Sequence, residues 1–175
     1  MIGALPEGVN FAVLVAQHMP EKFTRTFAER MDRRSRLRVR EAEHEDPIRA
    51  GDVFICPGMR CMEVFGSVDD PRLRVRHPLT SDRYVPSADR LFKSAAKTYG
   101  SKVIGVVLTG MADDGAKGSV AVREQGGHVI AESDENAVVF GMPRAVIEAG
   151  MANQVLPLGD VAQALLALDA IPLPH

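Results

Sequence analysis

The chain has 175 residues, 46% hydrophobic and 25% charged, which is enough apolar material for one folded domain over residues 1–175. The formal net charge of −2 excludes the strong basic excess typical of nucleic-acid-binding proteins, so we expect no nucleic-acid partner. No apolar run approaches the roughly 18 residues of a membrane span, and nothing resembles a signal peptide. We therefore expect a cytoplasmic protein without membrane insertion.

The first part of the chain predicts a buried strand, a helix and a hairpin. Phe11–Ala16 is a continuous apolar run, which is typical of a parallel strand buried on both faces. Pro20 begins a predicted helix with apolar residues at every fourth position. Val53–Cys56 and Cys61–Val64, joined through Pro57-Gly58, predict a β-hairpin.

The pentapeptide Arg-Leu-Arg-Val-Arg occurs twice, at Arg36–Arg40 and Arg72–Arg76. Its alternation of apolar and charged residues predicts two half-exposed strands with three arginines on one face. Two interpretations stay open. The arginines dock an acidic partner, or they are solvated faces whose charge discourages pairing at a strand edge.

The second part predicts alternating helices and strands. Ser87 is a good N-cap for a helix that Gly100 ends. The other predicted elements are a strand Val103–Leu108, a helix ending at Gly126-Gly127, a strand His128–Glu132, a helix Pro143–Gly150, a strand near Val155, a helix from about Asp160 to Leu168, and a short tail Ile171–His175. The pattern predicts an α/β fold: a three-layer sandwich with a mostly parallel, doubly wound sheet and an antiparallel hairpin extension at one edge.

Two predicted strand ends carry groups suited to acid–base chemistry. His18 follows the strand Phe11–Ala16, and Asp113 and Asp114 follow the strand Val103–Leu108. Because parallel α/β folds place their chemistry at the carboxyl ends of strands, a histidine and an aspartate there suggest two members of a hydrolytic triad. Alternatively, His18 is a strand-end histidine bonded to a backbone carbonyl.

The loop with the two aspartates allows three interpretations. A carboxylate could orient the histidine, cap the following helix, or hold Mg²⁺. Glycines at 110, 115 and 118 permit positive φ and close approach, so backbone N–H groups in this loop could stabilise an oxyanion.

A nucleophile is harder to find. No serine follows an apolar strand in a Gly-x-Ser context. Cys56 and Cys61 lie at the predicted turn without an activating group, and we expect two reduced thiols rather than a disulfide. No His-x-x-x-His or paired-Cys motif indicates a metal site, and we expect no metal and no cofactor.

Several motifs together resemble one family, the catalytic domain of the chemotaxis protein-glutamate methylesterases (CheB). The resemblance covers about Leu5 to Leu166. The motifs are Gln17-His18-Met19-Pro20, Phe23-Thr24, Glu41-Ala42, Gly51-Asp52, Pro57-Gly58, Pro86-Ser87-Ala88-Asp89-Arg90-Leu91-Phe92-Lys93-Ser94, Leu108-Thr109-Gly110-Met111-Ala112-Asp113-Asp114-Gly115-Ala116-Lys117-Gly118 and Val139-Phe140-Gly141-Met142-Pro143.

This resemblance implies a Ser-His-Asp esterase that removes methyl groups from glutamyl esters on methyl-accepting chemotaxis receptors. It places His18 on the base and Asp114 on the acid, and it puts an oxyanion and substrate loop at Gly110, Met111 and Ala112. Cys61 stands where the family usually has His, and Ala112 where it usually has Gly.

The family's serine lies in a Gly-Ala-Ser-Thr-Gly-Gly stretch after its first strand, and the resemblance implies that this chain lacks both the strand and the serine. The resemblance does not extend to the receiver domain that usually supplies phosphorylation control, so a receiver domain in trans is one candidate partner. Two hypotheses follow: a methylesterase domain whose nucleophile lies outside these residues, or a catalytically inactive receptor-binding or scaffold protein.

Overall fold

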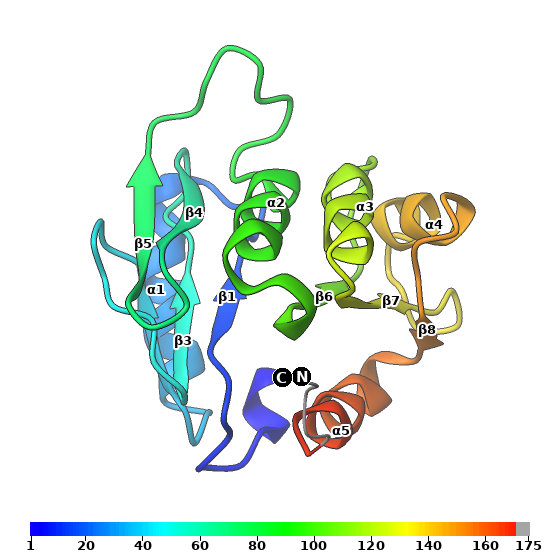
Figure 1. The fold of residues 1–175 in the computed structure, drawn as a ribbon, viewed down its shortest axis with the longest axis horizontal. Coiled ribbons are helices and arrows are strands. Elements are labelled where there is room, and N and C mark those ends of the chain that lie inside the picture. Colours follow the sequence, from blue (N-terminus) through cyan, green and yellow to red (C-terminus); the bar gives the residue numbers. More distant parts are fainter. Residues whose placement is uncertain (171–175) are drawn as a thin grey trace. The chain divides into compact units, whose positions relative to one another are not determined.

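The structure is a computed structural model that describes residues 1–170, so the predicted tail lies outside the described residues. The chain divides into two compact units. The N-terminal unit is Ile2–Leu91, and the C-terminal unit is the chain from Phe92 onward together with Met1. Figure 1 traces both units in sequence colours. The expectation of a single domain stays a prediction.

The N-terminal unit holds a parallel sheet and an antiparallel strand pair. The parallel sheet has the order β1-β3-β2, and α1 packs against β2 and β3. The pair β4-β5 is antiparallel, with Cys61 opposite Arg76. The elements are η1 (Ile2–Ala4), β1 (Val13–Val15), α1 (Glu21–Asp32), β2 (Arg38–Glu41), β3 (Asp52–Ile55), β4 (Cys61–Gly66) and β5 (Pro71–Arg76).

The hairpin predicted through Pro57-Gly58 is wrong. β3 pairs with β1 and β2, whereas β4 pairs with β5. All four residues of β3 are buried, which suits the central strand of a parallel sheet better than one arm of a hairpin. The Pro-Gly turn therefore connects two sheets. Its Gly58 N–H donates a hydrogen bond to the Thr24 hydroxyl of α1, 3.1 Å away.

The core of this unit joins residues of both sheets. Phe54 of β3, Met62 of β4 and Leu73 of β5 are almost completely buried, and Leu91 packs in the same cluster. Burial of such a side chain is worth about 1.5–3 kcal/mol relative to exposure. The Arg40 guanidinium lies 4.7 Å from the centroid of the Phe54 ring. Apolar side chains of β3, β4 and β5 thus supply the packing that holds the two sheets together.

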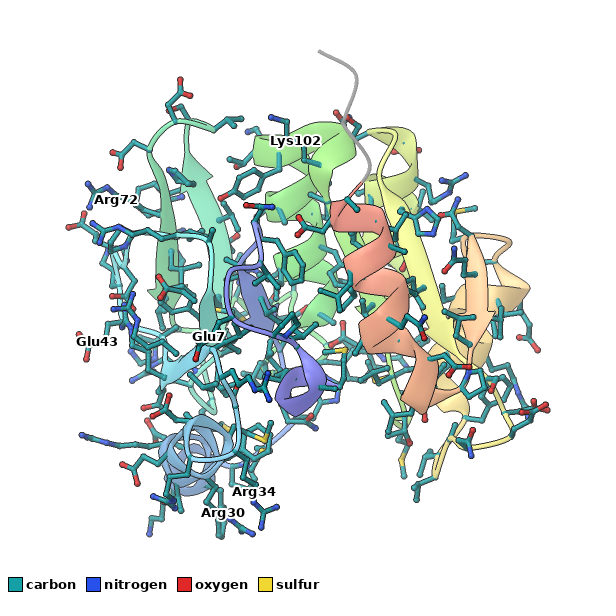
Figure 2. The ribbon with its side chains drawn as sticks, turned by 90° about the horizontal axis from the view of Figure 1, so that it is seen from below. Glu7, Arg30, Arg34, Glu43, Arg72 and Lys102 are labelled. Carbon is teal, nitrogen blue, oxygen red and sulfur yellow. The ribbon has the colours of Figure 1, made fainter. Side chains whose placement is uncertain are left out.

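The C-terminal unit is built on the parallel sheet β6-β7-β8. Helices α3 and α4 cover one face of this sheet and α5 covers the other (Figures 1 and 2). Helix α2 starts in the N-terminal unit and ends in this one. The elements are α2 (Ala88–Tyr99), η2 (Gly100–Lys102), β6 (Ile104–Val107), α3 (Ala116–Glu124), β7 (His128–Glu132), α4 (Gly141–Glu148), β8 (Gln154–Leu156) and α5 (Leu158–Asp169).

The ends predicted for α2 are confirmed. The Ser87 hydroxyl accepts a hydrogen bond from the Arg90 N–H at 3.3 Å, as an N-cap should. Gly100 has φ +58, a left-handed conformation that glycine adopts readily and that stops the helix.

The predicted α/β class, with mostly parallel strands and one antiparallel pair, is confirmed. Among residues 1–170, β1 pairs only with β3, and β6 pairs only with β7. β1, which leads to His18, is therefore an edge strand of its sheet, and β6, which leads to Asp114, is an edge strand of the other. No described helix is long and apolar enough to cross a membrane.

Candidate active site

His18 lies just beyond the carboxyl end of β1, in the segment that leads into α1. Its side chain is exposed, whereas the strand before it is registered residue by residue against buried β3. Its ring stacks on Tyr84, with centroids 5.8 Å apart. His18 thus lies at the end of a strand, as predicted from the sequence.

A buried hydroxyl fixes the turn that carries His18. Thr24 is 0% exposed, and its Oγ1 lies 2.5 Å from Glu41 Oε1 and accepts the Gly58 N–H. A Cβ on Gly58 would lie 2.5 Å from the backbone N of Glu21 and 2.7 Å from the carbonyl O of Met19. Only glycine permits this approach, so the Pro-Gly turn supports the backbone directly after His18.

The two adjacent aspartates have different environments. Both belong to the loop between β6 and α3 in the C-terminal unit, but Asp113 is exposed and Asp114 is 0% exposed. The N-cap of α3 is Gly115, with φ +93, rather than either aspartate. The Ser119 hydroxyl donates to the Gly115 carbonyl at 2.7 Å and fixes the start of the helix. A buried carboxylate is the kind that can orient a histidine.

The backbone of Gly110 is fully used within the C-terminal unit. Its N–H donates to the Val139 carbonyl, and its carbonyl accepts the Met142 N–H, both at 2.9 Å. A Cβ at this position would lie 2.3 Å from Met142 Sδ. Gly110 therefore ties the loop to the start of α4, and its own N–H is not available to an oxyanion.

Met111 and Ala112 are the remaining predicted members of the oxyanion loop. Both side chains are exposed, and among residues 1–170 neither backbone N–H has a hydrogen-bond partner. Ala112 has φ +74, a left-handed conformation that costs a non-glycine residue about 1–2 kcal/mol. Strain of this kind often occurs at functional loops.

Thr109 and Glu132 organise the loop, and neither was predicted from the sequence as a site residue. The Thr109 N–H donates to Glu132 Oε2 at 2.6 Å, and Glu132 is 1% exposed. The Thr109 hydroxyl donates to the Val139 carbonyl and accepts the Val139 N–H. The available signal was an acid at the end of the otherwise buried strand β7.

Both cysteines are free and 0% exposed, which confirms the prediction of reduced thiols. Burial raises the pKa of Cys56 to about 12. Burial, with Asp82 nearby, also raises the pKa of Cys61. Because the thiolate is the reactive form, these shifts oppose a nucleophilic role.

Five arginines of the repeated pentapeptide have the following intramolecular partners. Arg38 pairs with Asp52, and Arg40 pairs with Asp46 through two contacts of 2.6 and 2.7 Å. On β5, Arg72 pairs with Asp70, Arg74 lies over the Phe65 ring and Arg76 pairs with Glu63. Figure 2 shows Arg72 extending from the strand pair. These contacts favour the interpretation as solvated strand faces, and docking stays a prediction.

The magnesium interpretation of the aspartate loop receives no support. Among the described residues, no group of three or more His, Cys, Asp or Glu side chains is arranged to hold a metal ion. The structure thus describes His18 in one unit, and Asp114 with Gly110, Met111 and Ala112 in the other.

A parallel α/β protein with a histidine at one strand end and a buried aspartate at another has the features of a hydrolytic domain. The family model for CheB methylesterase matches residues 1–165, so the chain belongs to the CheB methylesterase family. The chain is similar to the crystal structure of the Thermotoga maritima CheB methylesterase catalytic domain, with a TM-score of 0.92 and 39% identity over 96% of this chain and 89% of that one.

Two curated relatives carry the name protein-glutamate methylesterase/protein-glutamine glutaminase. The Myxococcus xanthus protein is 49% identical over 89% of this chain and 45% of its own length. The Geobacter sulfurreducens protein is 45% identical over 93% of this chain and 44% of its own length. The chain thus spans less than half the length of these relatives.

Proposed function

We propose that this chain supplies the base, the acid and the oxyanion donors of an esterase that hydrolyses glutamate methyl esters on methyl-accepting chemotaxis receptors in the cytoplasm. The observation that carries the proposal is the contrast between Asp114 and Asp113. A triad acid is held away from water, and only Asp114 is buried. The same residue is the one that the resemblance to the family implies.

In the proposed reaction, a serine oxygen attacks the ester carbonyl carbon while His18 takes the serine proton. Asp114 orients the imidazole and stabilises its charged form. The carbonyl oxygen becomes an oxyanion, and the N–H groups of Met111 and Ala112 donate to it. His18 then gives the proton to the departing methoxide, which leaves as methanol, and water hydrolyses the acyl-enzyme by the same route.

The nucleophile in this proposal lies outside the 175 residues. No serine of the chain follows an apolar strand in a Gly-x-Ser context, and the two cysteines are buried with raised pKa values. We therefore expect no triad hydrolysis by these residues alone. A receiver domain acting in trans is the proposed source of phosphorylation control.

The decisive test uses the polypeptide purified from its native cells. Its intact mass comes first: a mass above 19.0 kDa, with added N-terminal residues that contain a Gly-x-Ser turn, is expected for the esterase. Methanol release from methylated receptor is then measured for the wild type and His18→Ala. Because a general base contributes about 10²–10⁴-fold, the variant should lose that factor.

His44→Ala is the matched control, since His44 is also an exposed histidine of the N-terminal unit, and its activity should equal the wild type. Receptor binding without methanol release in any form would refute the esterase and favour the inactive receptor-binding or scaffold protein. Methanol release by the 175 residues alone, dependent on His18, would refute the placement of the nucleophile.

A second activity is suggested by the relatives' name, which includes protein-glutamine glutaminase. The same acyl chemistry on a glutamine amide would release ammonia in place of methanol. We propose that the site also deamidates receptor glutamines. Ammonia release that His18→Ala abolishes would support this, and its absence from a preparation that releases methanol would refute it.

A further inference from the structure

The segment between β5 and α2 brings an aromatic ring to the predicted base. Tyr84 is half-buried, and its ring stacks on the imidazole of His18 with centroids 5.8 Å apart and planes 28° from parallel. Both residues belong to the N-terminal unit. Stacked aromatic rings attract one another at this separation, so the contact restrains the imidazole.

A cation also lies over the ring of Tyr84. The Arg83 guanidinium carbon lies 5.1 Å from the centroid of that ring. A guanidinium at this distance is attracted by the negative face of the ring. The Tyr84 ring therefore contacts both the Arg83 guanidinium and the His18 imidazole. The contact with Arg83 restrains the Tyr84 ring independently of His18.

The backbone around Tyr84 is anchored on both sides. Two residues earlier, the Asp82 carboxylate accepts the Leu79 N–H and the Arg90 guanidinium, each at 2.6 Å. Burial acts to raise the pKa of Asp82, but these two donors outweigh it and hold the pKa below its usual value. Three residues later, Ser87 caps α2. Tyr84 thus extends from a fixed part of the loop.

We propose that Tyr84 is a positioning residue that holds the imidazole of His18 by ring stacking. This inference rests on the proposed function, in which His18 is the general base. A proton carrier works only when its ring nitrogens point along the reaction path, and the stack on Tyr84 restrains the plane of the His18 ring. The Tyr84 ring, rather than its hydroxyl, does the holding.

The first experiment is an NMR measurement of the histidine ring protons in the 175-residue chain. An aromatic ring shifts the signals of protons stacked on it. We expect Tyr84→Leu to move the His18 ring signals toward those of a free histidine and Tyr84→Phe to leave them in place. Unmoved His18 signals in Tyr84→Leu would overturn the proposal.

The chain contains a matched control in a second stacked pair. His44 stacks on Phe65 with centroids 6.3 Å apart and planes 30° from parallel. Phe65→Leu should move only the His44 signals and Tyr84→Leu only those of His18. Movement of both sets in Tyr84→Leu would indicate a general loss of structure and overturn the specific role of Tyr84.

The second experiment measures methanol release by the polypeptide from native cells that carries the same substitutions. Stacking shifts the equilibrium between the held and the unstacked imidazole by about threefold to tenfold. Tyr84→Leu should therefore lower kcat by about that factor, with KM within about twofold of the wild type. Tyr84→Phe should restore kcat. A rise in KM with kcat unchanged would overturn the positioning role.

The two experiments separate failure of this inference from failure of the proposed function. Absence of methanol release from the wild type would refute the esterase and the proton-carrying role of His18. In either case, the NMR measurement tests whether the Tyr84 ring stacks on the His18 imidazole.

Discussion

Cys56 shows how burial of a single thiol couples stability to pH. Burial raises its pKa in the folded chain from the ordinary 9.0 to about 12. The thiol is therefore protonated in the folded chain at pH values where the unfolded chain has already ionised. The contribution of the protonated, buried thiol to the free energy of unfolding is therefore complete below pH 9.0. It is lost progressively as the pH rises toward about 12.

We expect the free energy of unfolding to fall more steeply with pH above 9.0 in the wild type than in Cys56→Ala. Urea unfolding of both proteins at a pH below 9.0 and at one between 9.0 and about 12 measures the difference. Lysine and tyrosine ionisation affects both proteins, so it cancels in the comparison. Equal losses in the two proteins would contradict the burial of an un-ionised thiol.

At the scale of elements, the backbone of the predicted oxyanion loop also packs closely against Gly141 at the start of α4. A Cβ on Gly141 would lie 2.9 Å from the carbonyl O of Gly110 and 3.0 Å from the backbone N of Ala112. These neighbours are backbone atoms, so they cannot turn aside as a flexible side chain would. The loop and the helix can approach this closely only because residue 141 has no side chain.

Gly141→Ala should therefore lower the free energy of unfolding by about 1–3 kcal/mol and displace the loop. The control is Gly159→Ala in α5, where a Cβ would have no neighbour within 4 Å, and where alanine should raise helix stability by up to about 1 kcal/mol. Urea unfolding measures both. A Gly141→Ala protein as stable as the wild type would show that the backbone contact is not tight in solution.

Much of the element order could be predicted from the sequence, because the signals are local. The strand His128–Glu132 has the predicted bounds, and Ser87 and Gly100 delimit α2 through chemistry that each residue carries itself. The hairpin failed because Pro57-Gly58 suits either a hairpin or a connection between sheets, and only the burial of β3 distinguishes them.

The candidate site shows the same limit. The positions of His18 and Asp114 after apolar strands are local facts of the sequence. Tyr84 lies 66 positions after His18 in the sequence, and no periodic pattern connects the two rings. The burial that separates Asp114 from Asp113 also depends on packing and could not be predicted from two identical neighbouring residues.

At the scale of the whole molecule, each unit has its own parallel sheet with one central strand. β3 and β7 are paired on both sides, and Val53–Ile55 and Val129–Ala131 are 0% exposed. Within residues 1–170, β1 and β6 are each paired on one side only. Amide hydrogens of strands paired on both sides exchange with solvent most slowly.

Hydrogen exchange followed by mass spectrometry should therefore find slowest exchange in peptides that contain β3 and β7, with β1 and β6 faster. The outer strands β2 and β8 are the controls, since each is also paired on one side among the described residues. Protection of β1 or β6 equal to that of β3 and β7 would contradict their position as edge strands and indicate that a further strand covers them in solution.

The side chain of Met111 is 76% exposed, whereas the contribution expected of this residue comes from its backbone N–H. A thioether so accessible is open to oxidation, which makes the side chain polar but leaves the peptide group intact. Side-chain replacement likewise leaves the donor in place, except for proline, which has no N–H. The sequence at this position can therefore drift, and the residue can suffer chemical damage, while the hydrogen-bond donor persists.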